Sequence, residues 1–148
     1  MQLSDFDLWI RLAAIGDITI LPGALCDIRI VEGQNLSRPS PAGMRRTQIE
    51  LASVLERFAA PPLLDRVPGI FPEMRFATTP GARKVALALR WRSSGGGFAL
   101  FADRMIAQVL EHAGERAEAV EAHGADFIKA FIESRGRAEF HLHGHDPA

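Results

Sequence analysis

Residues 98–113 read FALFADRMIAQVLEHA, and their apolar side chains recur at the spacing of an α-helix. One face of such a helix would carry only apolar side chains, those of Phe98, Phe101, Met105 and Val109. This stripe predicts a helix with one side buried in a core. Three neighbouring stretches also have helical spacing and are separated by glycines. They are residues 82–93, 115–123 and 126–134.

Upstream of these stretches, residues 44–60 predict one more helix. Its apolar stripe consists of Met44, Leu51, Leu55 and Phe58, with Val54 beside it. The following Pro61-Pro62 pair cannot continue a helix. Prolines at 62, 68, 72 and 80 then predict irregular structure between residues 63 and 80. The run SSGGG at 93–97 lacks the following Lys-Ser/Thr of a phosphate-binding loop, so we predict a flexible connector there.

The first forty residues have a different character. Ser4 is a predicted helix cap, and Gly16 is expected to end that helix. Two β-rich runs follow, ITIL at 18–21 and CDIRIV at 26–31, and we predict two short strands. The predicted fold class is therefore α+β and mostly helical: an N-terminal helix plus two short strands, then a four- to five-helix portion. We divide the chain into residues 1–40 and a helical C-terminal extension, residues 41–148.

Composition narrows the functional classes. The net charge of −1 provides no global attraction for nucleic acid, so no nucleic-acid partner is expected. The single cysteine, Cys26, excludes an intrachain disulfide framework and fits a reducing compartment. No apolar run approaches the ~18 residues that a membrane span requires. We expect a cytoplasmic location, which leaves room for peripheral association with a membrane.

The N-terminal helix carries the residues best suited to chemistry. Asp5 and Trp9 are four residues apart and so share one face. A carboxylate at a helix N-terminus is favoured by the helix dipole and can act as a general base towards a hydroxyl. The indole of Trp9 offers a flat apolar surface for a sugar ring. The alternative interpretation is structural, with Asp5 and Asp7 complementing the dipole and Trp9 packed in the core.

Residues 4–37 resemble the acceptor-side end of inverting family-2 glycosyltransferases with the GT-A type of fold. The motif Asp-Leu-Trp-Ile-Arg at residues 7–11 matches the family's acidic residue followed by Leu-Trp-Leu-Arg. Asp5 matches the aspartate of the acidic pair that precedes it. In the family, a second strand that contains an arginine leads into a loop with Gly, Asn and Ser. These positions match Arg29, Gly33, Asn35 and Ser37. The resemblance covers about the first 40 residues.

The resemblance implies a function for each of these positions. Asp5 would be the catalytic base that deprotonates the acceptor hydroxyl for attack on a nucleotide-activated sugar with inversion. Trp9 would line the acceptor site or pack beneath it, and Arg29, Asn35 and Ser37 would bind substrate. Asp7 and Arg11, an i,i+4 pair, would hold the helix in place. The acceptors of the family are often lipid-linked and lie at membrane surfaces.

The chain departs from the family pattern at three points. Ser4 stands where the family frequently has glutamate, and Val31 and Glu32 stand where many relatives have a histidine. The donor-binding α/β layer and its Asp-x-Asp metal motif would precede Asp5, where only four residues are present. We therefore expect a fragment of a longer transferase that is inactive alone. A divalent metal, Mg or Mn, is expected in the full-length enzyme, with no metal ligand in this chain.

Two other functional classes remain open. The helices after residue 40 could form a non-enzymatic interaction module for docking or oligomerisation, with the N-terminal motif as a remnant. The C-terminal histidines could bind zinc, nickel or copper, since His141, His143 and His145 alternate beside Asp146. A solvated chain end is the simpler interpretation of those histidines. Likewise, Arg90 and Arg92 could contact phosphates or form an ordinary solvated helix face.

Overall fold

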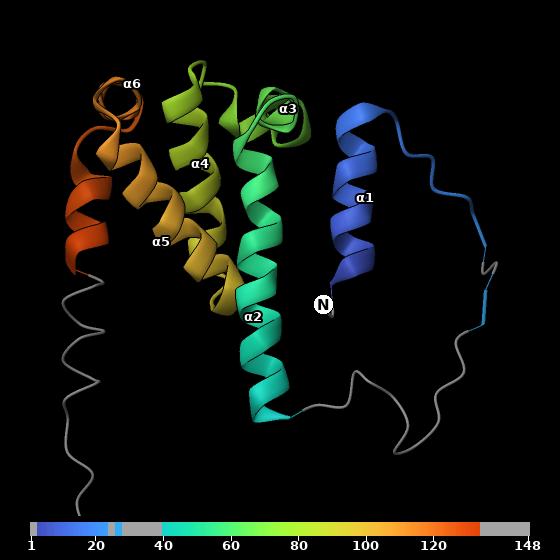
Figure 1. Ribbon diagram of the computed structural model, residues 1–148. Helices are drawn as coiled ribbons and strands as arrows, with labels where there is room; N and C mark the ends of the chain where they lie inside the picture. Colours follow the sequence, from blue (N-terminus) through green and yellow to red (C-terminus); the bar gives the residue numbers. More distant parts are fainter. Residues whose placement is uncertain (1–2, 24–25, 28–39, 134–148) are drawn as a thin grey trace, which may run out of the picture.

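The computed structural model describes residues 3–23, 26–27 and 40–133, and its regular structure is entirely helical. A first helix, α1 (Ser4–Ile15), stands beside the body of the molecule in Figure 1. The body contains five labelled α-helices, two short 3-10 helices and a last helical segment at 126–133. Their bounds are α2 (Pro41–Leu55), η1 (Glu56–Ala59), α3 (Leu63–Ile70), η2 (Pro72–Met74), α4 (Pro80–Arg92), α5 (Gly96–Glu111) and α6 (Ala113–His123).

The α+β prediction is wrong, because the described residues contain no strand and form an all-α fold. The first β-rich run, residues 18–21, is described and has no regular secondary structure, with Ile20 89% exposed. A strand needs a partner for its backbone N–H and C=O groups, and no described residue supplies one to this run. Of the second run, only Cys26 and Asp27 are described, and neither is in a strand. None of the described helices is long and apolar enough to cross a membrane.

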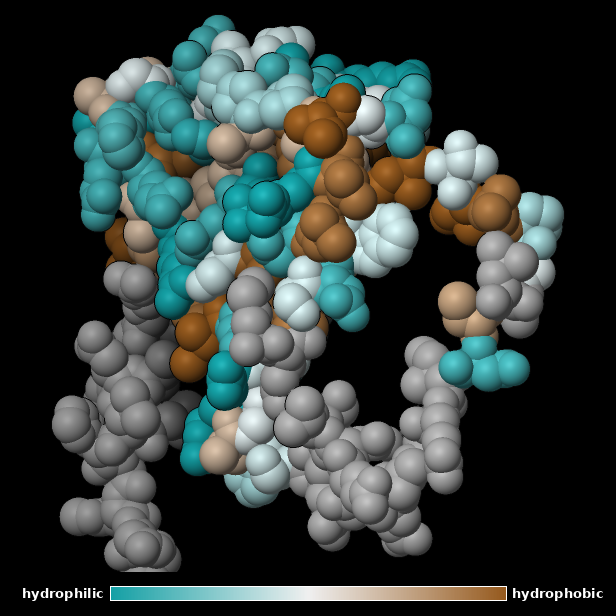
Figure 2. Space-filling model, turned by 45° about the vertical axis from the view of Figure 1, so that its right-hand side comes forward, coloured by the Kyte–Doolittle hydropathy of each residue, from teal (hydrophilic) through white to brown (hydrophobic). Residues whose placement is uncertain are grey.

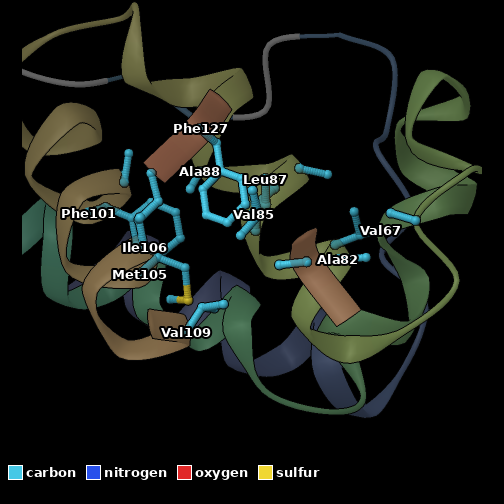
Figure 3. Packing of buried hydrophobic residues seen from close by; sticks show 14 of the residues in the cluster. Val67, Ala82, Val85, Leu87, Ala88, Phe101, Met105, Ile106, Val109 and Phe127 are labelled. Atoms are coloured by element: carbon cyan, nitrogen blue, oxygen red, sulfur yellow. The ribbon is translucent and has the colours of Figure 1, made fainter. Parts of the chain in front are cut away.

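The main core lies between α2, α4, α5 and α6, and α3 and the segment 126–133 add buried side chains to it. The stripe predicted on α5 is confirmed, since Phe101, Met105 and Val109 are fully buried and Phe98 packs against the core from its edge. Figure 3 shows residues of α5 grouped with Val85 and Leu87 of α4. Burial of this apolar surface is the main source of the body's stability.

Glycines allow two close helix crossings within the body. Gly97 lies at the start of α5, where its N–H donates to the side-chain Oε1 of Gln48 on α2. A Cβ at Gly97 would lie 2.6 Å from the Gln48 carbonyl oxygen and 2.9 Å from Cβ of Leu51. A Cβ at Gly81 of α4 would similarly meet the backbone of Glu115 on α6. The prediction of a flexible connector at 93–97 is thus wrong for Gly96 and Gly97, which begin α5.

Residues 63–80 are more helical than their prolines predicted. Three buried side chains, Leu63, Leu64 and Val67, give α3 an apolar face that packs onto the body. Pro68 lies inside the helix and removes one N–H donor, but the helix ends only two residues later. Apolar burial therefore outweighs the local cost of the proline at this position.

Two helix starts also differ from prediction. Helix α2 begins at Pro41, three residues before the predicted Met44, because Ser40 caps it by accepting from the Gly43 N–H at 3.0 Å. At α1 the cap residue is Leu3, and the predicted cap Ser4 is the first helical residue. The Ser4 hydroxyl donates to the neighbouring Asp5 Oδ1 at 3.5 Å. The predicted end of α1 at Gly16 is confirmed.

Helix α1 joins the body through a small second cluster. Ile10 packs with Val54 of α2 and Leu63 of α3, and this group is separate from the main core. Near the C-terminal end of α1, Arg66 donates from Nη1 to the Ala13 carbonyl at 2.7 Å. These contacts fix which side of α1 faces the body and which side faces solvent.

Candidate functional site

The two aspartates of α1 lie in different surroundings. Asp7 is 9% exposed and accepts a charged hydrogen bond at Oδ1 from Nε of Arg57 on η1. Its other oxygen lies 3.9 Å from Nη1 of Arg11, one turn along α1. A buried carboxylate needs such partners, because desolvating an unpaired charge is costly. Asp7 is therefore committed to holding α1 against the body.

Asp5, in contrast, is exposed and has no ion pair among the described residues. The only hydrogen bond of its carboxylate within the described part of the chain is the long one from the Ser4 hydroxyl. It lies in the first turn of α1, where the partial positive charge of the helix terminus favours a carboxylate. Its oxygens can therefore accept a proton or a hydrogen bond from a molecule in solution.

Trp9 lies one turn after Asp5 and is 55% exposed. Residues four apart on a helix are neighbours on its surface, so the carboxylate and the indole form one small solvent-facing site. Trp9 is therefore not the core residue of the structural interpretation, because more than half of it is exposed. The tryptophan that packs against the core is Trp91. Trp91 makes ring contacts with Phe58, Phe71, Phe98 and Phe101.

The remaining predicted substrate-binding residues lie outside the described part of the chain. These are Arg29, Asn35 and Ser37. The histidine tail, with His141, His143, His145 and Asp146, also lies outside it. Of the predicted catalytic and substrate-binding residues, the structure therefore describes only Asp5 and Trp9, one turn apart on α1.

The two arginines beside Trp91, Arg90 and Arg92, contact other residues of the body. Arg90 pairs with Glu73 at 2.7 Å and stacks over the Phe71 ring at 4.5 Å. Arg92 Nε lies 3.5 Å from Asp103 Oδ1. Both arginines therefore have partners within the body, which favours the helix-face interpretation of the motif over phosphate contact.

Sequence reasoning missed Arg57, which is the principal partner of Asp7. The two residues are 50 positions apart, and no local pattern connects them. One signal was present, because Asp7 and Ile10 lie three residues apart and so share the helix face that turns inward. An acid on an inward face needs a cation, but only the tertiary structure identifies which one.

The resemblance places its divalent metal on a motif that would precede Asp5, outside the described residues. No group of three or more His, Cys, Asp or Glu side chains in residues 3–23, 26–27 and 40–133 is placed to hold a metal ion. Asp5 and Asp7 are two positions apart on one helix, so their side chains point in different directions. No chemical step in this part of the chain is therefore assigned to a metal.

Comparison with known proteins assigns no family. No family model, no curated protein and no solved structure matches this chain. What supports a function is therefore the exposed residues Asp5 and Trp9, the buried Asp7 with its partner Arg57, and the resemblance carried by residues 4–37.

Proposed function

We propose that this chain supplies the acceptor side of an inverting glycosyl transfer, with Asp5 as the general base. The observation that carries the proposal is the difference between the surroundings of the two aspartates of α1. Asp7 is buried and paired with Arg57, whereas Asp5 faces solvent one turn before an exposed indole. A base for an external hydroxyl has to be accessible and held on a fixed element, and Asp5 meets both requirements.

In the proposed reaction, a carboxylate oxygen of Asp5 accepts the proton of an acceptor hydroxyl. The acceptor oxygen then forms a bond to the anomeric carbon of a nucleotide-activated sugar. The bond from that carbon to the nucleotide diphosphate breaks on the opposite side, and the configuration inverts. The nucleotide diphosphate leaves with the bonding electrons, and Asp5 later releases its proton to water.

Other residues of α1 would orient the acceptor and the base. The indole of Trp9 would stack on the apolar face of a sugar acceptor beside Asp5. The Asp7–Arg57 pair would keep α1 at a constant angle to the body, so that Asp5 approaches the hydroxyl in one geometry. The helical body thus serves as the support for the acceptor site.

The proposal includes a donor-binding portion outside the described residues. By resemblance, a nucleotide-binding α/β layer and an Asp-x-Asp motif with Mg or Mn would precede Asp5. The metal would neutralise the leaving diphosphate when bound. Without that portion, we expect the 148-residue chain alone to transfer no sugar.

The first test is the DNA upstream of the Met1 codon. We expect an in-frame coding segment with alternating strands and helices that ends in an Asp-x-Asp motif. The protein from that longer reading frame should transfer sugar from a nucleotide donor to an acceptor alcohol. An in-frame stop codon directly before Met1 would contradict the proposal.

A non-enzymatic helical interaction module is the second candidate, and one observation favours it. The main core, built from α2 to α6, η2 and the segment 126–133, is formed without any side chain from α1. The body could therefore fold and bind a partner with α1 as a remnant. This candidate predicts the in-frame stop codon and a body, residues 40–133, that stays folded when residues 1–23 are removed.

A further inference from the structure

A groove of about 430 Å³ lies where α1 meets the turn between η1 and α3. Its volume is within the ~300–1,000 Å³ range of small-molecule sites. Two segments supply its apolar walls, α1 and the proline-containing turn. The apolar lining residues are Leu8, Ile10, Leu12, Ala14 and Ile15 on one side and Ala60, Pro61, Pro62 and Leu63 on the other.

Two arginines, Arg11 and Arg57, also line this groove, and only one described carboxylate pairs with them. Both guanidinium groups pair with the Asp7 carboxylate, so the three side chains together have a net charge of +1. The Arg11 side chain is 62% exposed, and its contact with Asp7 is a long 3.9 Å. Most of its N–H donors are therefore free to bind an anion from solution.

The apolar walls remain open to water. Leu8 is 49% exposed and Ile15 is 84% exposed. Figure 2 shows hydrophobic side chains gathered on the side of the molecule where α1 lies. An apolar ligand that covered these walls would remove their surface from water, which favours binding.

We propose that this groove binds an amphipathic anion: a single apolar chain that ends in a phosphate or a carboxylate. The chain would lie along Leu8, Leu12 and the Pro61-Pro62 turn, and the anionic group would bind Arg11. The positive charge of Arg11 favours an anionic head group, and the apolar walls favour an apolar tail. The inference is independent of the proposed glycosyl transfer, since neither Asp5 nor Trp9 lines the groove.

Calorimetric titration of the full chain with dodecyl phosphate, below its micelle concentration, tests the proposal. We expect saturable binding of one molecule per chain. Dodecanoate should also bind, whereas butyl phosphate, dodecyl maltoside and dodecyltrimethylammonium should bind at least about tenfold more weakly because each lacks the tail or the negative charge. Equal affinity for the anionic, neutral and cationic detergents would overturn the proposal, as would no binding of dodecyl phosphate.

Matched variants locate the site. Arg11→Gln should weaken dodecyl phosphate binding about fivefold, since an exposed charge contributes up to ~1 kcal/mol. Arg45→Gln removes an exposed arginine of α2 and should leave binding unchanged. Leu12→Ser should weaken binding, whereas Ile49→Ser on the exposed face of α2 should not. Equal effects of a groove variant and its control would overturn the proposal.

The same face could instead be covered by a second copy of the chain. Sedimentation equilibrium distinguishes this outcome, because the proposal expects a wild-type monomer. A wild-type dimer that Leu12→Asp converts to a monomer would assign the apolar face to self-association and overturn the proposal.

Discussion

Arg57 of η1 and the buried Asp7 of α1 form an ion pair that links the body to the helix carrying Asp5. The pair spans 50 positions of sequence and lies beside the small cluster of Ile10, Val54 and Leu63. Because that cluster is small, the ion pair is a large part of what holds α1 in place. The orientation of the proposed base thus depends on a residue of the helical body.

Arg57→Gln should release α1 from the body. It leaves the Asp7 carboxylate without its main partner, at a cost of about 1–2 kcal/mol, because the half-exposed Arg57 side chain contributes less than a fully buried one. We expect the amides of α1 to lose protection in hydrogen exchange while those of α5 keep it. Arg11→Gln is the control and should change α1 protection little. Unchanged α1 protection in Arg57→Gln would show that the pair does not hold the helix.

Gly97→Ala should destabilise the body by about 1–3 kcal/mol in urea unfolding, because a Cβ there meets α2 and overpacks the crossing. Gly69→Ala is the matched control. No atom lies within 4 Å of a Cβ at Gly69, an exposed position of α3, so this change should be neutral or slightly stabilising. Equal stabilities for the two variants would contradict the close approach of α2 and α5.

Ser40→Ala should destabilise the body by about 1 kcal/mol, because it removes the side-chain cap of α2. Ser4→Ala should leave stability within ~0.5 kcal/mol of wild type, because Ser4 does not cap α1. Thermal unfolding of the two variants measures this difference directly. A larger loss for Ser4→Ala than for Ser40→Ala would mean that the helix starts are wrongly placed.

The helices were predictable wherever an apolar stripe repeats over several turns. The stripe of Phe101, Met105 and Val109 on α5 is the clearest case, since its period alone identifies the buried face. The strand prediction at 18–21 was wrong because β-rich composition cannot supply a neighbouring strand. The irregular structure predicted around Pro68 was wrong because burial of Leu64 and Val67 outweighs a missing N–H.

The site was predictable only in its local part. The i,i+4 spacing places Asp5 and Trp9 on one face without any tertiary information. The exposure of Trp9 and the burial of Asp7 depend on which side of α1 packs on Val54 and Leu63, and no local pattern determines that. Arg57 joins the site from a distant helix, so sequence spacing could not identify it.

The most direct test of the account is the transfer rate of Asp5→Asn in the protein from the longer reading frame. The amide keeps the shape of the side chain but cannot take up the proton of the acceptor. We expect sugar transfer to fall at least about 100-fold, the lower range for loss of a general base, with folding unchanged by circular dichroism. Asp17→Asn alters an exposed acid beyond α1 and should keep the wild-type rate. Undiminished transfer by Asp5→Asn would contradict the account.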